Sequence, residues 1–222
     1  MTEDFSQADD LATKNPKKLA ELQKLFDTEA KAHHVYPLDD RAGARFDPSK
    51  LPLAGGARQS YVYYPGATRI PERSAPYTIG RSYTITAELD NTKGDANGVV
   101  VAMGGVAGGW SLYVKDGKLD YVFNDFGESM HTIAASRPLP KGKVKAVVDF
   151  VADAGGPGKG ANITLSMNGQ EVGKTRTERT AAAAISLDET FDVGPDFGSP
   201  VGDYPAGWRF EGTLEKVSLD LK

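Results

Sequence analysis

The sequence predicts a mainly β protein: a two-sheet antiparallel β-sandwich of the jelly-roll type, preceded by one N-terminal helix. Two dipeptides, Asp116-Gly117 and Asn168-Gly169, are typical of two-residue hairpin turns, in which both central residues need positive φ. Short β-branched and aromatic runs, separated by Gly- and Pro-rich turns, recur after residue 58, and helical periodicity is almost absent there. This repetition indicates two packed sheets, and we favour a jelly roll over a closed barrel.

The chain divides into three predicted parts. Residues 1–40 are expected to hold a loose arm and an amphipathic helix, which starts with Asn15 as cap and Pro16 at its first position. Residues 41–57 are rich in Pro, Gly, Asp and Arg and are interpreted as a linker. Residues 58–222 form the predicted sandwich. The apolar positions of the helix, which ends near residue 32, are Leu19, Leu22, Leu25 and Phe26.

The hairpin around Asp116-Gly117 is the centre of the predicted sandwich. A type I′ turn there places Leu112 opposite Tyr121 and Trp110 opposite Phe123, so that one face is a wall of large apolar groups. Because this face needs a cover, a second sheet is expected to pack on it. The opposite face is expected to be mostly wet, with Val122 as an exception; its other residues are Ser111, Tyr113, Asp120 and Asn124.

Further strands are predicted from alternating or continuous apolar runs. The turn at Asn168-Gly169 places Leu165 opposite Val172 in the simplest register. The last strand changes apolar parity part-way, which predicts a β-bulge near Glu215 and Lys216. The predicted strands span residues 59–64, 82–90, 99–101, 131–135, 144–151, 163–167, 171–175, 191–194 and 208–221.

Composition excludes several classes of partner and site. The formal net charge of −4 gives no basic footprint for nucleic acid or for an anionic membrane. The chain has no cysteine, which excludes disulfides, thiolate metal sites and a cysteine nucleophile. No apolar run reaches membrane-spanning length, and the first ten residues are too polar and acidic for a signal peptide. The sequence therefore leaves the compartment open.

Motifs for catalysis are incomplete, and we predict no catalytic residue. The glycine-rich stretch at 155–160 lacks the first glycine and the final Ser or Thr of a phosphate-binding loop. Glu88 and Asp90 have the spacing of a glycosidase pair, but Thr92 occupies the next alternate position, and a solvated strand face is the favoured interpretation. No Gly-x-Ser-x-Gly elbow is present.

An acidic stretch provides the candidate metal ligands. Asp188, Asp192 and Asp196 lie close together in glycine-bearing loops, and carboxylate oxygens in such loops can hold a structural Ca²⁺ ion. The alternative is an ordinary solvated acidic loop, and we favour it. We therefore expect no cofactor and keep calcium as the open exception.

Aromatic residues provide the candidate ligand-binding positions. Sugar rings present apolar C–H faces to aromatic planes, and their hydroxyl groups need polar partners nearby. Tyr63, Tyr113, Tyr204 and Trp208 are the glycan-binding candidates on this basis. They belong to a wider set that also includes Tyr61, Tyr64 and Tyr77. The alternative is that about half of this wider set packs the sandwich, as aromatic residues generally do.

Several motifs resemble the C-terminal region of long bacterial arylsulfatases. One is the run GGVAGGWSLYVKDGK at 104–118, and others are the glycine turn at 156–160 and LDETFDVG at 187–194. The helix and the following YPLDDR at 36–41 look like the segment that closes the sulfatase domain in that family. The resemblance covers nearly the whole chain and implies a concanavalin A-like jelly roll.

The chain departs from this family at the catalytic motif. The family's formylglycine arises from Cys or Ser in a Cys/Ser-x-Pro-x-Arg motif, whereas the stretch from Ser74 has Thr78 in place of the arginine. The family's N-terminal acidic metal ligands are absent too. The resemblance therefore implies a non-catalytic accessory module, whose partner is a sulfatase catalytic domain or subunit and which helps to hold a glycan.

Two alternatives remain open: a stand-alone carbohydrate-binding lectin, and a hydrolase whose sulfatase activity needs a separate catalytic domain. The apolar face of the N-terminal helix is expected either to fold back onto the sandwich or to mediate self-association.

Overall fold

The computed structural model describes residues 5–6, 8–41 and 58–222. The chain splits into two compact units, Met1–Ala57 and Arg58–Lys222. The prediction of a linker at 41–57 falls almost wholly on residues outside the described ones. In the described ranges, no helix is both long and apolar enough to cross a membrane.

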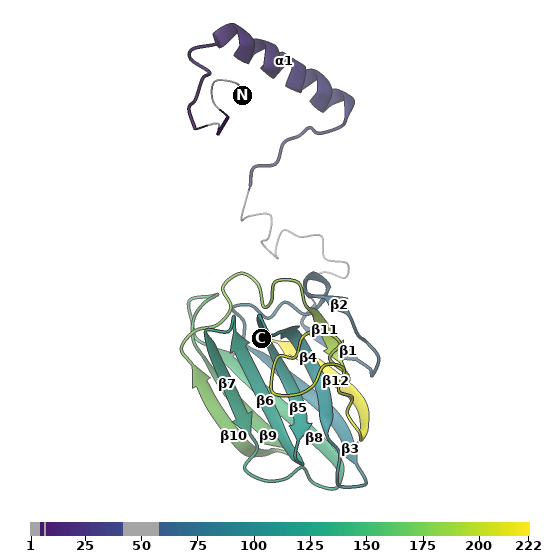
Figure 1. Ribbon diagram of the computed structural model, residues 1–222. Coiled ribbons are helices and arrows are strands. Elements are labelled where there is room, and N and C mark those ends of the chain that lie inside the picture. Colours follow the sequence, from purple (N-terminus) through teal and green to yellow (C-terminus); the bar gives the residue numbers. More distant parts are fainter. Residues whose placement is uncertain (1–4, 7, 42–57) are drawn as a thin grey trace. The chain divides into compact units, whose positions relative to one another are not determined.

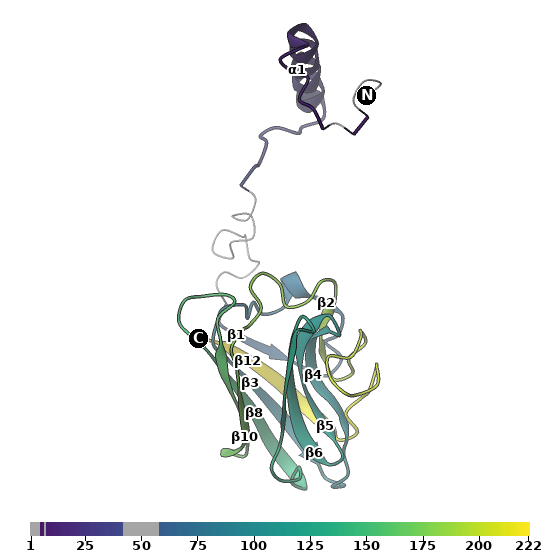
Figure 2. The same ribbon diagram turned by 60° about the vertical axis from the view of Figure 1, so that its left-hand side comes forward.

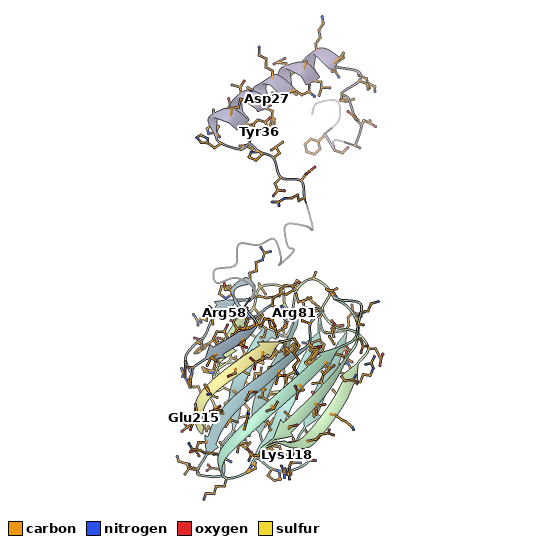
Figure 3. The ribbon with its side chains drawn as sticks, turned by 180° about the vertical axis from the view of Figure 1, so that it is seen from behind. Asp27, Tyr36, Arg58, Arg81, Lys118 and Glu215 are labelled. Carbon is orange, nitrogen blue, oxygen red and sulfur yellow. The ribbon has the colours of Figure 1, made fainter. Side chains whose placement is uncertain are left out.

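The first unit contains the predicted helix, α1, at Pro16–Ala32. Asn15 is the N-cap residue and Pro16 begins the helix, as predicted. The Asn15 side chain does not bond to the first turn, however; its Nδ2 donates to the carbonyl of Leu11 at 3.3 Å. Figure 3 shows Tyr36 beside Asp27, and the tyrosine hydroxyl donates a hydrogen bond to that carboxylate. The apolar residues along the helix are exposed: Leu19, Leu22, Leu25 and Phe26.

The second unit is the predicted antiparallel β-sandwich, and Figures 1 and 2 show its two sheets face to face. Each sheet has six strands within residues 58–222. The first sheet has the order β1 (Ser60–Tyr63), β12 (Thr213–Leu221), β3 (Tyr83–Asn91), β8 (Gly142–Ala152), β9 (Ala161–Met167), β10 (Gln170–Thr177). The second sheet has the order β2 (Ile70–Pro71), β11 (Thr190–Val193), β4 (Gly98–Gly105), β5 (Gly108–Lys115), β6 (Lys118–Asp125), β7 (Ser129–Ala134). A 3₁₀ turn, η3 (Glu72–Ser74), follows β2.

The register of the central hairpin is confirmed. Asp116 and Gly117 have φ of +50° and +70°, the values that a type I′ turn needs. In consequence Leu112 pairs with Tyr121 and Trp110 with Phe123, with their side chains buried between the sheets. From the first sheet, alternate residues of β3 fill the same core; they are Tyr83, Ile85, Ala87 and Leu89. Removing each large side chain from water contributes about 1.5–3 kcal/mol to folding.

Two register predictions for the later strands have different outcomes. Leu165 pairs with Gly173 instead of Val172, because a bulge between Glu171 and Gly173 shifts the pairing by one residue. The predicted bulge in the last strand is confirmed, and it lies between Leu214 and Lys216.

The last strand itself begins later than predicted, at Thr213 rather than at residue 208. The preceding residues belong to a loop that contacts the second sheet through a parallel bridge between Arg209 and Val99.

The outer face of the hairpin is not wet, which corrects the sequence prediction. Ser111, Tyr113, Val122 and Asn124 are all buried. The connection between β11 and β12, residues 194–212, lies over this face, and we call it the covering segment. It brings Val201 and Tyr204 into a second small apolar cluster, with Val99, Ala102, Tyr113 and Val122 from the sheet.

Candidate ligand-binding surface

The covering segment collects several of the residues that the sequence predicted to bind ligands. It carries Asp196, Tyr204 and Trp208, and it places Tyr204 against Tyr113 of β5, with ring centroids 4.9 Å apart. Tyr113 is 2% exposed and Tyr204 is 7% exposed. These two rings therefore pack the covering segment onto the sheet and offer no open plane to a sugar, which corrects the prediction for both. Trp208 is partly buried against the same cluster.

Asp196 is a buried carboxylate within this segment. Its Oδ2 accepts a hydrogen bond from the Tyr204 hydroxyl at 2.9 Å, and its Oδ1 accepts one from the Gly198 amide at 3.2 Å. Burial raises the pKa of Asp196 to about 6, although both hydrogen bonds act in the opposite direction. Burial also raises the pKa of Tyr204, so its hydroxyl remains a donor at neutral pH.

The other two calcium candidates do not join Asp196 in a ligand set. Asp192 is buried on β11, and its two oxygens accept hydrogen bonds from the Arg69 amide and the Thr190 hydroxyl, both at 2.7 Å. Asp188 lies in an exposed loop. Across the described part of the chain, no group of three or more His, Asp or Glu side chains is arranged to hold a metal ion. Calcium binding remains a prediction.

The exposed part of this region is the ring of Phe197, which two arginines contact. Phe197 follows the buried Asp196, and its side chain is 40% exposed. The guanidinium of Arg69 lies over the ring at 5.2 Å from the centroid, and that of Arg209 at 5.7 Å. Both distances lie within the range of cation–π contacts. We call these three residues the Phe197 cluster.

The backbone fixes each member of the Phe197 cluster. The Arg69 amide donates to the buried Asp192 carboxylate, and Arg69 has a φ of +56°. The stretch before Arg209 is held to β4, because the Val99 amide donates to the carbonyl of Trp208 at 3.3 Å. Next to Phe197, the carbonyl of Asp196 accepts a hydrogen bond from the Gly207 amide. Backbone hydrogen bonds of two segments, the β1–β2 connection and the covering segment, thus hold the cluster in place and leave its guanidinium nitrogens unused.

The two guanidinium groups have no acidic partner among the residues that the structure describes. Arginines elsewhere in the sandwich are paired: Arg176 bonds to Asp153 and Glu178, and Arg179 to Asp125 and Glu128. No ion pair of Arg69 or Arg209 exists within residues 5–6, 8–41 and 58–222.

Tyr63, the remaining glycan candidate, belongs to a neighbouring group of rings on β1. Its ring is parallel to that of Tyr61, with centroids 6.4 Å apart, and contacts Phe191 of β11 at 4.8 Å. The Arg58 guanidinium lies 5.7 Å from the Tyr61 ring centroid. Burial raises the pKa of Tyr63. Tyr61 and Tyr63 are both half-buried, so each keeps part of its surface open.

The connection from β1 to β2 links these rings to the Phe197 cluster. It runs from the first sheet to the second and carries Arg69 (Figure 1). Its Gly66 amide donates to the carbonyl of Val193, and the Val193 amide donates back to Ala67. The rings of Tyr61 and Tyr63 and the Arg69 guanidinium therefore lie near the edge where β1, β2 and β11 meet, and the covering segment brings Phe197 and Arg209 to Arg69 from beside β11 and β4.

A groove on the first sheet is less suited to a sugar. It has a volume of about 270 Å³ and is lined by Glu88, Leu89, Lys143, Val144, Lys145, Asn168 and Glu215. Lys143 and Glu215 are ion-paired at 3.3 Å across it. The groove contains no aromatic ring, so it lacks the plane on which a sugar ring stacks.

The sequence prediction missed Phe197, Arg69 and Arg209. Each lies in a loop, and nothing in its immediate neighbours distinguishes it from other exposed residues. Only Trp208-Arg209, an aromatic residue next to a cation, partly indicated a ligand-binding position in the sequence.

Comparison with known proteins adds no family assignment. No protein-family model and no curated protein sequence matches the chain. Solved structures with a related sandwich include the Ruminococcus gnavus IT-sialidase CBM40 bound to α2,3-sialyllactose, which is 16% identical with a TM-score of 0.47. That match covers 73% of this chain and 89% of the other.

Two further matches are similarly distant. Domains LG4-5 of the mouse laminin α1 chain are 18% identical with a TM-score of 0.46, covering 76% of this chain and 42% of that one. The leech intramolecular trans-sialidase is 15% identical with a TM-score of 0.46, covering 73% of this chain and 25% of that one. Values this low assign no function.

Proposed function

We propose that residues 58–222 form a non-catalytic module that binds glycans at the edge of the sandwich where β1, β2 and β11 meet. The observation that carries this proposal is the Phe197 cluster, a partly exposed ring that two guanidinium groups contact. The backbone hydrogen bonds around the cluster support the proposal, because a preformed site loses little entropy when it binds a ligand.

The chemistry of this edge suits a sugar. The apolar C–H face of a sugar ring stacks on an aromatic side chain, and its oxygens accept hydrogen bonds from nearby donors. Phe197 supplies the ring, and the guanidinium groups of Arg69 and Arg209, which contact that ring, supply the hydrogen-bond donors. The half-exposed rings of Tyr61 and Tyr63 extend the aromatic character of the same edge.

A glycan array tests this function. The wild-type protein is expected to bind at least one class of glycan, and Phe197→Ala is expected to weaken that binding by about tenfold or more, as loss of a stacking plane does in other sites. Phe126→Ala is a matched control, because Phe126 is 38% exposed, close to the 40% of Phe197, and lies in the turn between β6 and β7. It is expected to bind like the wild type.

Two results contradict the proposal. One is a folded wild-type protein that binds no glycan on the array. The other is an equal loss of glycan binding in Phe197→Ala and Phe126→Ala, because the loss would then not be specific to the Phe197 cluster.

We also propose, from the sequence motifs at 104–118 and 187–194, that this module accompanies a sulfatase catalytic domain or subunit. The chain lacks the formylglycine motif, so the purified protein is expected not to hydrolyse 4-nitrophenyl sulfate. Turnover of that ester by the wild-type chain alone would contradict the non-catalytic assignment.

A further inference from the structure

The chemistry of the Phe197 cluster also indicates which sugars it takes. We propose that Arg69 and Arg209 select a sugar that carries an acidic group, either a sulfate ester or a carboxylate. This inference rests on the proposed glycan-binding function and adds the charge class of the ligand.

The first argument is the type of hydrogen-bonding group at the site. A guanidinium has five N–H donors and no acceptor. The hydroxyl groups of a neutral sugar both donate and accept, so a site that offers only donors leaves their protons unpaired. Sulfate and carboxylate oxygens only accept, and they match the planar fork of arginine in geometry as well as in charge.

The second argument is the charge balance around the cluster. Asp192 and Asp196, the acidic residues closest to Phe197 along the chain, are both 1% exposed and accept hydrogen bonds from other groups. Glu72, three residues after Arg69, accepts from Ile185 and Ser186, and Glu211, two residues after Arg209, accepts from the Asn97 amide. They therefore do not occupy the guanidinium nitrogens. A chain of net charge −4 thus displays, over one ring, two cations that form no ion pair with any residue that the structure describes.

The third argument is the orientation that stacking imposes. A guanidinium that lies over an aromatic ring uses its flat face for that contact and keeps its N–H edge free. Because Arg69 and Arg209 both lie over Phe197, an acidic group next to that ring is within reach of two such edges. The exposed 40% of the Phe197 side chain then offers apolar surface next to that acidic group.

The test uses three ligands with a common core: lactose, lactose 3′-sulfate and 3′-sialyllactose. Calorimetry measures their binding to the wild-type protein, to the double variant Arg69→Gln/Arg209→Gln and to Lys118→Gln. Lys118 is an exposed cation at the start of β6, outside the Phe197 cluster (Figure 3), and serves as the charge control. Nuclear magnetic resonance of the arginine Nε–H groups, during titration with inorganic sulfate, reports contact with the anion directly.

We expect lactose 3′-sulfate, 3′-sialyllactose or both to bind about tenfold or more tightly than lactose, which is the size of effect that a charge-assisted pair gives. The double variant is expected to abolish that difference, while Lys118→Gln retains it. The two acidic ligands separate a sulfate preference from a carboxylate preference.

The outcomes separate this inference from the proposed function. Equal binding of all three ligands, unchanged by the double variant, overturns the acidic-sugar inference and leaves glycan binding in place. If inorganic sulfate changes the Nε–H chemical shifts of Arg69 and Arg209 but no glycan binds, the anion site is supported and the glycan-binding function is overturned. An absence of both overturns the two proposals together.

Discussion

The Tyr204 hydroxyl is the point at which the covering segment is most sensitive to a small change. It donates to the buried Asp196 carboxylate at 2.9 Å and accepts from the Val201 amide at 3.3 Å. Tyr204→Phe keeps the ring against Tyr113 and removes both bonds. Each buried polar group left unpaired costs about 1–3 kcal/mol, so we expect a loss of about 2–4 kcal/mol in the free energy of unfolding near neutral pH.

The loss should depend on pH because Asp196 titrates. Its folded pKa of about 6 lies above the ordinary 3.8, so Asp196 contributes its full stability when protonated, below about pH 3.8, and that contribution is lost as the pH rises through about 6. The Tyr204 hydrogen bond lowers this pKa, so Tyr204→Phe raises it further. The cost of the substitution should therefore be greater at about pH 7.5 than at about pH 4.5.

Urea unfolding at the two pH values, followed by tryptophan fluorescence, measures this cost. Trp110 reports the core and Trp208 reports the covering segment. Tyr64→Phe is the control, since Tyr64 is 64% exposed, and it should change stability by less than about 0.5 kcal/mol. A cost below about 0.5 kcal/mol for Tyr204→Phe, or one that is equal at both pH values, would refute this reasoning.

Three further outcomes are expected. Gly98→Ala should prevent stable folding, because Gly98 has a φ of +114° and the added Cβ would overlap the carbonyl of Arg209. Gly117→Ala, at a φ of +70° with open space around the added Cβ, should lower the free energy of unfolding by only about 1 kcal/mol, and thermal melting compares the two variants. Asp196→Asn should reduce the fall in the free energy of unfolding between about pH 4 and pH 7, of which Asp196 supplies at most about 3 kcal/mol. Urea unfolding measures this fall, and the same pH dependence in the variant and the wild type would contradict the account of a buried carboxyl group. Calcium in place of EDTA should leave the melting temperature unchanged, because the oxygens of Asp192 and Asp196 already accept bonds from protein donors, and a clear rise would identify a calcium site.

The local features of the fold were determined by the sequence alone. Asp116-Gly117 specifies a type I′ turn through its backbone conformation, and the two-residue period then sets every pair of the hairpin. The parity change before Lys216 located the last bulge for the same reason. These features depend on residues close together in the chain, so short-range patterns are sufficient to predict them.

The tertiary structure decided what covers each face and which loops meet. Tyr113 was expected on a wet face because the segment that buries it, around Tyr204, lies far later in the chain. The aromatic residues near it were chosen by type, but only packing could show that Tyr113 and Tyr204 are buried while Phe197 remains open. The Phe197 cluster joins residue 69 to residues 197 and 209 through β2, β11 and β4. No local pattern encodes such a meeting, because long-range pairing of strands brings these loops together.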